Sequence, residues 1–159
     1  MTSRDDPSSS SILIRGGTTV VGDVVAQSDV LIRGEEIAAI GDLAGVEADT
    51  LVDAGGLLVL PGGVDTHVHF NDVFMGTVSV HDYFTGTRAA AFGGTTSVID
   101  FSNQVPEGTL MKTLQDKRDE AQGKAFVDWG VHPVITRPDE ETLAEIPGIV
   151  AAGAPTIKC

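Results

Sequence analysis

The sequence predicts an α/β fold in which a small β-sandwich segment, residues 12–60, precedes the first part of a (β/α)8 barrel, residues 61–159. Two observations lead to this fold class. Before Pro61, short apolar runs alternate with glycine turns, a pattern typical of short antiparallel strands. After Pro61, apolar runs alternate with amphipathic segments, which is typical of parallel strands joined by helices.

The N-terminal part of the chain is rich in hairpin signals. Residues 1–11 are rich in Ser and Asp, and we expect a disordered tail there. The pairs Gly22-Asp23 and Gly34-Glu35 separate apolar runs and predict tight turns between neighbouring strands. The expected strands cover residues 12–15, 18–21, 24–27, 29–33, 36–40, 50–53 and 57–60. Together they predict the small β-sandwich.

The part after Pro61 predicts about four strands and three helices. The expected strands cover residues 64–70, 95–101, 125–135 and 154–159, and the expected helices cover 79–92, 110–122 and 138–152. A complete barrel takes roughly 250 residues, so this part corresponds to about half of one. We therefore expect the N-terminal portion of a longer protein, or a truncated product. The alternative, a complete flavodoxin-like sheet, is disfavoured because the chain ends in a strand with no closing helix.

The charge of the chain argues against two classes of partner. It has 23 acidic and 10 basic residues and a net charge of −13, which disfavours binding to nucleic acid or to anionic membranes. No run of 18 apolar residues and no apolar signal core occur, so we expect a cytoplasmic protein without a membrane span. The single cysteine, Cys159, agrees with a reducing compartment. The acidic excess fits an ordinary cytoplasmic protein or one from a salt-adapted host.

A His-x-His motif follows a Pro-Gly-Gly break. Asp65, His67 and His69 alternate along the first expected barrel strand, where side chains two apart point to the same side. Two neighbouring imidazoles are good metal ligands, and one cation would satisfy both rings. The alternative is a pair of hydrogen-bonded core histidines. We favour a metal site, with Asp65 orienting a ligand histidine from behind or fixing the turn.

This segment resembles the first metal-binding strand of the amidohydrolase superfamily, Pro-Gly-x-x-Asp-x-His-x-His. Later segments narrow the resemblance to the dihydropyrimidinase and D-hydantoinase family, cyclic amidohydrolases that open dihydropyrimidine and hydantoin rings. These segments are Phe-Met-Gly-Thr at 74–77, residues 82–96, and Ile-Asp-Phe at 99–101. The resemblance runs from about residue 12 to the end of the sequence.

The resemblance assigns a role to Lys158. By composition alone Lys158 would be a surface lysine, because lysine is almost never buried unpaired. Residues 153–158, Gly-Ala-Pro-Thr-Ile-Lys, resemble the family's lysine strand. This implies that CO₂ carbamylates Lys158 and that the carbamate bridges two divalent metal ions, usually zinc. The implied metal ligands are His67, His69 and the carbamylated Lys158, and small or apolar neighbours would favour the neutral amine that reacts with CO₂.

The reaction implied by the resemblance is hydrolysis of a C–N bond in a small cyclic amide by a hydroxide that bridges the metal ions. In the family, the Asp that moves the proton, the Tyr that steadies the oxyanion and two further His ligands lie beyond the lysine. We therefore expect no catalytic acid or base before Cys159, and no activity from this polypeptide alone. The resembled enzymes are commonly homotetramers, which implies an oligomer for the full-length protein.

Several other residues have two readings. Phe74 and Met75 are candidates for the wall of the substrate pocket, or they simply pack. His81 is expected to be exposed, and His132, near the pocket mouth at the end of the third barrel strand, to be a hydrogen-bonded core histidine rather than a ligand. Asp100 could face the site or cap a loop. No catalytic partner can be named for Cys159, which argues against a nucleophilic role.

Alternatives within and outside the family remain open. Dihydroorotases usually follow the His pair with an Arg, and this chain has Phe70-Asn71-Asp72 instead. Allantoinases share an Asn at position 71 but lack the segments at 74–77 and 99–101, so an allantoinase-type enzyme is the second choice. A catalytically inert dihydropyrimidinase-like scaffold is the third, and zinc binding distinguishes it from an enzyme.

Overall fold

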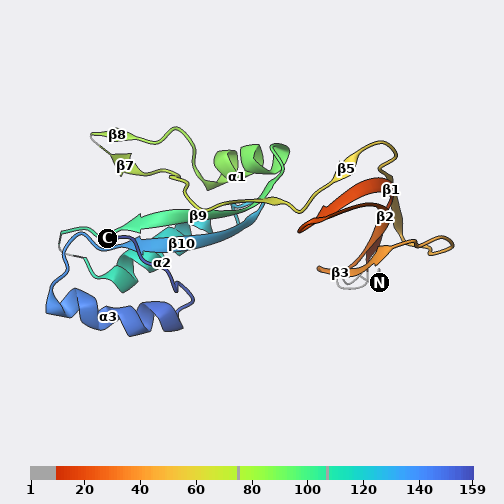
Figure 1. Ribbon diagram of the computed structural model, residues 1–159. Helices are drawn as coiled ribbons and strands as arrows, with labels where there is room; N and C mark the ends of the chain where they lie inside the picture. The colour runs from red at the N-terminus through yellow and green to blue at the C-terminus, as the bar shows by residue number, and fades with distance from the viewer. Residues whose placement is uncertain (1–9, 75, 107) are drawn as a thin grey trace, which may run out of the picture. The chain divides into compact units, whose positions relative to one another are not determined.

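The computed structural model describes residues 10–74, 76–106 and 108–159. The chain divides into two compact units, Met1–Pro61 and Gly62–Cys159, each with its own sheet (Figure 1). Among the described residues, no helix combines the length and the apolar character that a membrane span requires.

The first unit is a five-stranded sheet. Its strands are β1 (Ser11–Val21), β2 (Val24–Arg33), β3 (Glu36–Gly41), β4 (Thr50–Asp53) and β5 (Leu58–Val59). The order is β3-β2-β1-β4, and β5 also pairs with β1. The hairpins β1–β2 and β2–β3 are antiparallel, whereas β4 and β5 run parallel to β1.

This unit corrects three details of the sequence analysis. The expected β-sandwich is a single sheet of mixed direction among the described residues. Four of the expected short strands merge into two long ones, because the glycines at 16 and 17 form an irregularity within β1 rather than a turn. Residues 1–9 of the expected tail lie outside the described residues, whereas Ser11 belongs to β1, and its N–H and Oγ donate to Asp49.

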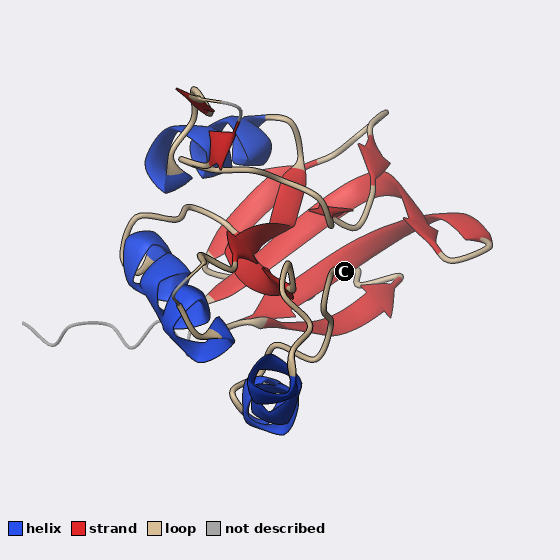
Figure 2. Cartoon of the chain, turned by 90° about the vertical axis from the view of Figure 1, so that its left-hand side faces the viewer, coloured by secondary structure: helices blue, strands red, loops and turns tan. Residues whose placement is uncertain are grey.

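The second unit is built on a parallel sheet. Its strands are β6 (Gly63–Asp65), β9 (Thr95–Asn103) and β10 (Asp128–Val134), in the order β10-β9-β6, with a further parallel bridge between Val134 and Lys158. A small hairpin of β7 (Val73–Phe74) and β8 (Thr77–Val78) follows β6. The helices are α1 (Tyr83–Phe92), α2 (Leu110–Ala121) and α3 (Glu140–Ala151). Strand and helix therefore alternate as expected, and the helices lie beside the strands (Figure 2).

Each helix begins at a capping side chain. Asp82, Thr109 and Asp139 accept hydrogen bonds from the backbone of the first turns of α1, α2 and α3. Asp82 forms a capping box with Thr85, so α1 begins at residue 83 and not at the expected residue 79. The hydroxyl of Ser79 instead accepts the backbone N–H of Asp72.

Two apolar clusters fix the helices on the sheet. One lies between α2, α3 and β10, and the other joins α1, α2 and β9 to the segment after β6. The first contains Leu110, Leu114, Val131, Ile135, Ile149 and Ala154, and the second contains Phe70, Tyr83, Val98 and Ala121. The carboxyl ends of the three strands are thereby held in one place, which positions the side chains that follow them.

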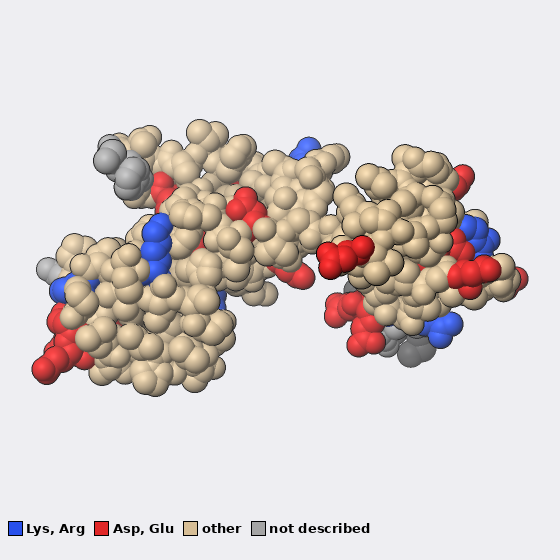
Figure 3. Space-filling model, in the orientation of Figure 1, with Lys and Arg blue, Asp and Glu red and all other residues tan. Residues whose placement is uncertain are grey.

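Charged side chains are dispersed over the surface of both units. On the face shown in Figure 3, basic side chains occur as small separate groups, and acidic side chains occur on both units. This face offers no broad basic surface of the kind that binds the phosphate backbone of nucleic acids.

Candidate metal centre

The two histidines of the His-x-His motif lie just beyond the carboxyl end of β6. This strand ends at Asp65, earlier than the sequence suggests. The chain then continues beside β9, where the N–H of Val68 donates to the carbonyl of Ile99 at 3.1 Å. The ring centroids of His67 and His69 lie 5.2 Å apart. The structure therefore brings both imidazoles together although neither belongs to a strand.

Phe101, on β9, lies beside both imidazoles and is 4% exposed. Its ring centroid is 4.6 Å from that of His67 and 5.0 Å from that of His69. The Nζ atom of Lys158 lies 4.3 Å from the same centroid, and the His132 ring centroid lies 5.4 Å away. Four polar side chains, which come from distant parts of the sequence, thus gather around one aromatic ring.

Lys158 extends the sheet at its carboxyl end. Its backbone N–H donates to the carbonyl of Pro133 at 3.0 Å, and its carbonyl accepts the N–H of Ile135 at 2.8 Å. The side chain is exposed, not enclosed by apolar neighbours as the sequence analysis expects. Within the described part of the chain, its ammonium has no carboxylate partner and contacts the Phe101 ring.

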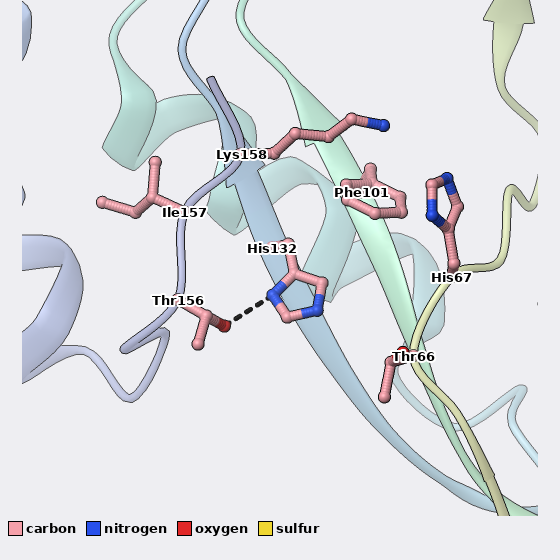
Figure 4. Close-up of a pocket in the computed structure, with 7 residues that line it drawn as sticks. All are labelled: Thr66, His67, Phe101, His132, Thr156, Ile157 and Lys158. Atoms are coloured by element: carbon pink, nitrogen blue, oxygen red, sulfur yellow. Dashed lines mark hydrogen bonds between the residues drawn. The ribbon is translucent and has the colours of Figure 1, made fainter.

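His67, Phe101, His132 and Lys158 line a pocket of about 270 Å³ at the carboxyl end of the sheet, whereas His69 is not part of its lining. Its lining residues are Thr66, His67, Phe101, His132, Thr156, Ile157 and Lys158. Figure 4 shows the Lys158 side chain extending past Phe101 toward His67. Parallel α/β folds place ligand sites at this end of the strands.

The nitrogen atoms around Phe101 fit the chemistry of a divalent metal ion. Neither ring nitrogen of His67 makes a hydrogen bond within the described residues. His69 uses Nδ1, which lies 2.6 Å from Oδ2 of Asp72, and this leaves its Nε2 open. Imidazole nitrogens of this kind are common ligands of divalent metal ions.

A second group of possible ligands lies beside the pocket. Ligand atoms of His69, Asp72 and Asp100 lie within 4.8 Å of one another. The buried ammonium of Lys117 stands among these groups, with Nζ 3.1 Å from Oδ2 of Asp100 and 3.6 Å from Oδ1 of Asp72. Lys117 already supplies the positive charge that a metal ion would bring, so we place the candidate metal centre at the Phe101 pocket.

Asp100 lies beneath the pocket and does not open into it. Its side chain is fully buried, and its Oδ1 accepts the backbone N–H of Phe101 at 2.7 Å and that of Phe70 at 3.4 Å. Burial raises the pKa of the Asp100 carboxyl above its ordinary value, and the nearby Lys117 ammonium opposes this shift. Asp100 therefore fixes the backbone on which the pocket is built.

Other predicted residues have different positions. The Oδ1 atom of Asp65 accepts the backbone N–H of His67 at 3.0 Å, so it fixes the turn, and within the described chain it bonds to neither imidazole. His81 is exposed, as expected. Phe74 is placed in β7, but its side chain lies outside what the structure describes, as does Met75.

His132 lies at the pocket and not in the core. It is half-buried, it lines the pocket, and its Nδ1 lies 2.5 Å from Oγ1 of Thr156 (Figure 4). The expectation of a hydrogen-bonded histidine agrees with this contact, whereas the expectation of a core position does not.

Sequence reasoning missed the polar groups under the pocket. Asp72 comes three residues after His69, and Lys117 lies on the buried side of α2, where a lysine requires partners. The position of Lys117 on the apolar side of the predicted helix is the sequence signal that could have pointed to these groups. The partners themselves come from distant parts of the sequence, so the pairing could not be predicted.

Comparison with known sequences agrees with this geometry. The profile of the Amidohydrolase family matches residues 58–151. The chain is 38% identical over 138 residues to a D-hydantoinase of Geobacillus stearothermophilus, covering 87% of this chain and 29% of that protein. It is 37% identical over 149 residues to a dihydropyrimidinase of Rattus norvegicus, covering 87% of this chain and 29% of that protein.

Solved structures lead to the same family. The D-hydantoinase of Bacillus sp. AR9 matches with a TM-score of 0.84 and 42% identity, over 89% of this chain and 31% of that one. A dihydropyrimidinase from Brevibacillus agri NCHU1002 matches with a TM-score of 0.84 and 41% identity, over 88% of this chain and 30% of that one. The chain thus spans about 30% of the length of these relatives. The resemblance read from the motifs is confirmed, and the chain belongs to the amidohydrolase family.

Proposed function

We propose that this chain contributes part of the active site of a metal-dependent hydrolase that opens a small cyclic amide, a hydantoin or a dihydropyrimidine. The observation that carries the proposal is the convergence of His67, His69 and Lys158 on Phe101. The names of the relatives, D-hydantoinase and dihydropyrimidinase, support this class of substrate.

The parallel sheet is, in this proposal, the first part of a (β/α)8 barrel. Strands β6, β9 and β10, with the segment at Lys158, would occupy about four neighbouring strand positions of this barrel. The likeness to solved D-hydantoinases supports this inference. A barrel collects side chains from several strand ends into one site, which accounts for a metal centre made from residues far apart in the sequence.

The three candidate ligands have distinct tasks. His67 and His69 would hold a divalent cation, zinc in this proposal, through their ring nitrogens. The neutral amine of Lys158 would form an N–C bond with CO₂ and release one proton, which leaves a carboxylate whose two oxygens can reach two cations. Divalent cations in this place would supply Lewis acidity, which polarises an amide carbonyl and acidifies water.

Phe101 and Asp65 would keep these ligands in position. Phe101 presents an apolar ring beside both imidazoles and the lysine stem, so their rotamers are limited by packing. Asp65 fixes the backbone at His67 through its hydrogen bond to the N–H.

A ring-opening assay tests the proposal in the protein that carries this sequence. With zinc and bicarbonate present, we expect hydrolysis of dihydrouracil or hydantoin, and we expect His67→Ala to reduce it to background. His81→Ala is the matched control, because His81 is exposed outside the pocket, and it should keep full activity. Hydrolysis of allantoin alone would replace the proposed substrate with that of an allantoinase-type enzyme.

The carbamate has its own test. After exchange with ¹³C-bicarbonate, a ¹³C NMR signal of a carbamate should be present in the wild-type protein and absent from Lys158→Ala. Lys124→Ala, which removes an exposed lysine elsewhere, should keep the signal. A carbamate signal that persists in Lys158→Ala would exclude Lys158 as its site.

A further inference from the structure

The carboxylate of Asp72 lies between a candidate metal ligand and a buried lysine. Its Oδ2 is 2.6 Å from Nδ1 of His69, and its Oδ1 is 3.6 Å from Nζ of Lys117. The side-chain amide of Asn103 donates to both oxygens of Asp72 at 3.2 Å. The backbone N–H of Asp72 donates to Ser79, which fixes the residue from the other side. Asp72 is therefore held by several contacts and not by His69 alone.

These contacts determine where the proton lies between His69 and Asp72. The Lys117 ammonium and the Asn103 amide both present donors to Asp72, so its oxygens act as acceptors. The proton in the contact with His69 then belongs to Nδ1. In a neutral imidazole, protonation at Nδ1 leaves the lone pair on Nε2, which is the nitrogen that remains open for a metal ion.

Lys117 holds Asp72 from a buried position. Its side chain is 8% exposed, and Nζ lies 3.1 Å from Asp100, 3.6 Å from Glu120 and 3.6 Å from Asp72. It also donates to the carbonyl of Phe70, the residue directly after His69. Lys117 therefore contacts both the backbone beside His69 and the carboxylate that bonds its ring. We call Asp72, Asp100, Asn103 and Lys117 the buried network, after its buried members Asp100 and Lys117; Asp72 is half-buried and Asn103 is exposed.

We propose that Asp72, held by Lys117, is a positioning residue that fixes His69 in the Nδ1–H tautomer and keeps its Nε2 open for a metal ion beside Phe101. Metal-binding histidines generally donate their other ring nitrogen to a carboxylate or a carbonyl, which fixes the ring and raises its basicity. The inference deepens the proposed function, on which it rests for the role of His69 as a ligand. The hydrogen bond itself does not depend on that role.

The tautomer can be measured in the metal-free protein. Protein labelled with ¹⁵N-histidine, at a pH of about 8.5 where ordinary imidazoles are neutral, gives long-range ¹H–¹⁵N patterns that distinguish the two tautomers. The His69 signal is assigned by its loss in His69→Gln. We expect the Nδ1–H pattern in the wild type and the Nε2–H pattern, which free histidine prefers in water, in Asp72→Leu. A wild-type pattern in Asp72→Leu would overturn the proposal.

Two further variants test Lys117 and guard against a failure to fold. Lys117→Met should give a mixture of both tautomers, because Asp72 loses its buried partner, and an unchanged pattern would remove Lys117 from the proposal. If Asp72→Leu does not fold, Asp72→Asn replaces it. One amide oxygen cannot serve His69 and the donors of Lys117 and Asn103 together, so a mixture is expected there as well, and a pure Nδ1–H pattern would contradict the account.

Asp116→Leu and Lys112→Met are the matched controls. Both residues lie on the exposed side of α2 and pair with each other, and neither contacts His69. Both variants should keep the wild-type tautomer.

Zinc affinity provides the second measurement. Competition with a chelator should show about 10- to 100-fold weaker binding in Asp72→Leu, the range typical for loss of a carboxylate behind a ligand histidine. If the wild type shows the Nδ1–H tautomer of His69 but binds no zinc, the contact with Asp72 is supported and the proposed function is refuted. If the wild type binds zinc tightly and Asp72→Leu shows the same tautomer and the same zinc affinity, the proposed function stands and the positioning role of Asp72 is refuted.

Discussion

The Phe101 pocket and the buried network beneath it are built in different ways, although His69 and Phe101 join them. In the pocket, His67, His132 and Lys158 lie beside one aromatic ring, and the described contacts of these three side chains include a single hydrogen bond, between His132 and Thr156. In the network, Asp72, Asp100, Asn103 and Lys117 are held by ion pairs and by backbone groups.

The difference shows where the order of the site comes from. In the network, Oδ1 of Asp100 accepts backbone N–H groups and Oδ2 pairs with the Lys117 ammonium at 3.1 Å, which fixes the backbone under the pocket. The pocket side chains keep nitrogen atoms open, which is the state that a metal ion or a CO₂ molecule needs. A change in the network should therefore affect folding, whereas a change in the pocket should affect ligand binding and leave stability nearly intact.

The largest effect on stability is expected for Lys117→Met. This variant leaves the buried carboxylate of Asp100 and the half-buried carboxylate of Asp72 without their ammonium, and breaking a buried ion pair in this way typically destabilises by about 3–5 kcal/mol. Urea unfolding at pH 7 measures the loss. Lys112→Met removes an exposed ion pair on the same helix and should change stability by less than about 1 kcal/mol. Equal losses in the two variants would contradict the distinction between network and surface.

A smaller loss is expected for Gly86→Ala in α1. A Cβ atom at this position would lie 2.2 Å from Cε1 of Phe70, whose carbonyl accepts from Lys117. Overpacking of this kind destabilises by about 1–3 kcal/mol, and the better helix propensity of alanine offsets at most about 1 kcal/mol. Gly130→Ala is the control, because its Cβ would meet Ile99 at ordinary distances of 3.7 Å and more. A Gly86→Ala variant as stable as the wild type would show that Phe70 moves freely.

Thr156→Val should have a still smaller effect on the free energy of unfolding. It removes the hydrogen bond to His132 in the open pocket, and a typical hydrogen bond contributes about 0.5–1.5 kcal/mol, with exposed ones at the low end. Chemical denaturation measures the change. A loss of stability as large as that of Lys117→Met would mean that the pocket contributes as much to folding stability as the network does.

The smallest effect is expected in the dependence of stability on pH. Burial raises the pKa of Asp100 in the folded state, so the folded protein takes up this proton at a higher pH than the unfolded chain does. Asp100 should therefore add stability as the pH falls through its raised pKa, and Asp100→Asn should lose this gain. Urea midpoints at a series of pH values test the sign.

Asp82 provides the opposite case. The backbone N–H of Thr85, which donates to Asp82, lowers the pKa of that carboxyl below its ordinary value of 3.8. Its stabilisation is present above that value and is lost as the pH falls through the lower, folded-state pKa. Asp82→Asn should therefore be less stable than the wild type near neutral pH, and this difference in the free energy of unfolding should shrink as the pH falls. A pH slope of the same sign for both aspartates would contradict the assignment of Asp100 to the buried network.

Much of the fold could be predicted from local signals. The turns at residues 22–23 and 34–35 and the ends of α2 follow from glycine, proline and capping rules, and these elements lie where expected. The glycines at 16 and 17 read as a turn in sequence, but pairing of β1 with three other strands keeps them within one strand. The start of α1 was predicted at residue 79, but Asp82 caps the helix and Ser79 instead bonds to Asp72.

The site could be predicted only where it is local or where it follows the family pattern. The spacing of His67 and His69 places both side chains on one side of any extended segment, so their proximity follows from the spacing alone. The role of Phe101 and the pairing of Asp72 with Lys117 depend on which strands and helices meet, and no spacing within the sequence encodes that. Lys158 came from the resemblance, and the structure adds its position beside Phe101.

The most direct test of the metal centre is equilibrium dialysis with zinc on the wild type, His67→Ala and His81→Ala. We predict stoichiometric zinc in the wild type and in His81→Ala, and a loss of bound zinc in His67→Ala, because His67 lines the Phe101 pocket and His81 does not. A wild-type protein that binds no zinc, or a His67→Ala variant that binds as much as the wild type, would contradict the metal centre and favour a dihydropyrimidinase-like scaffold.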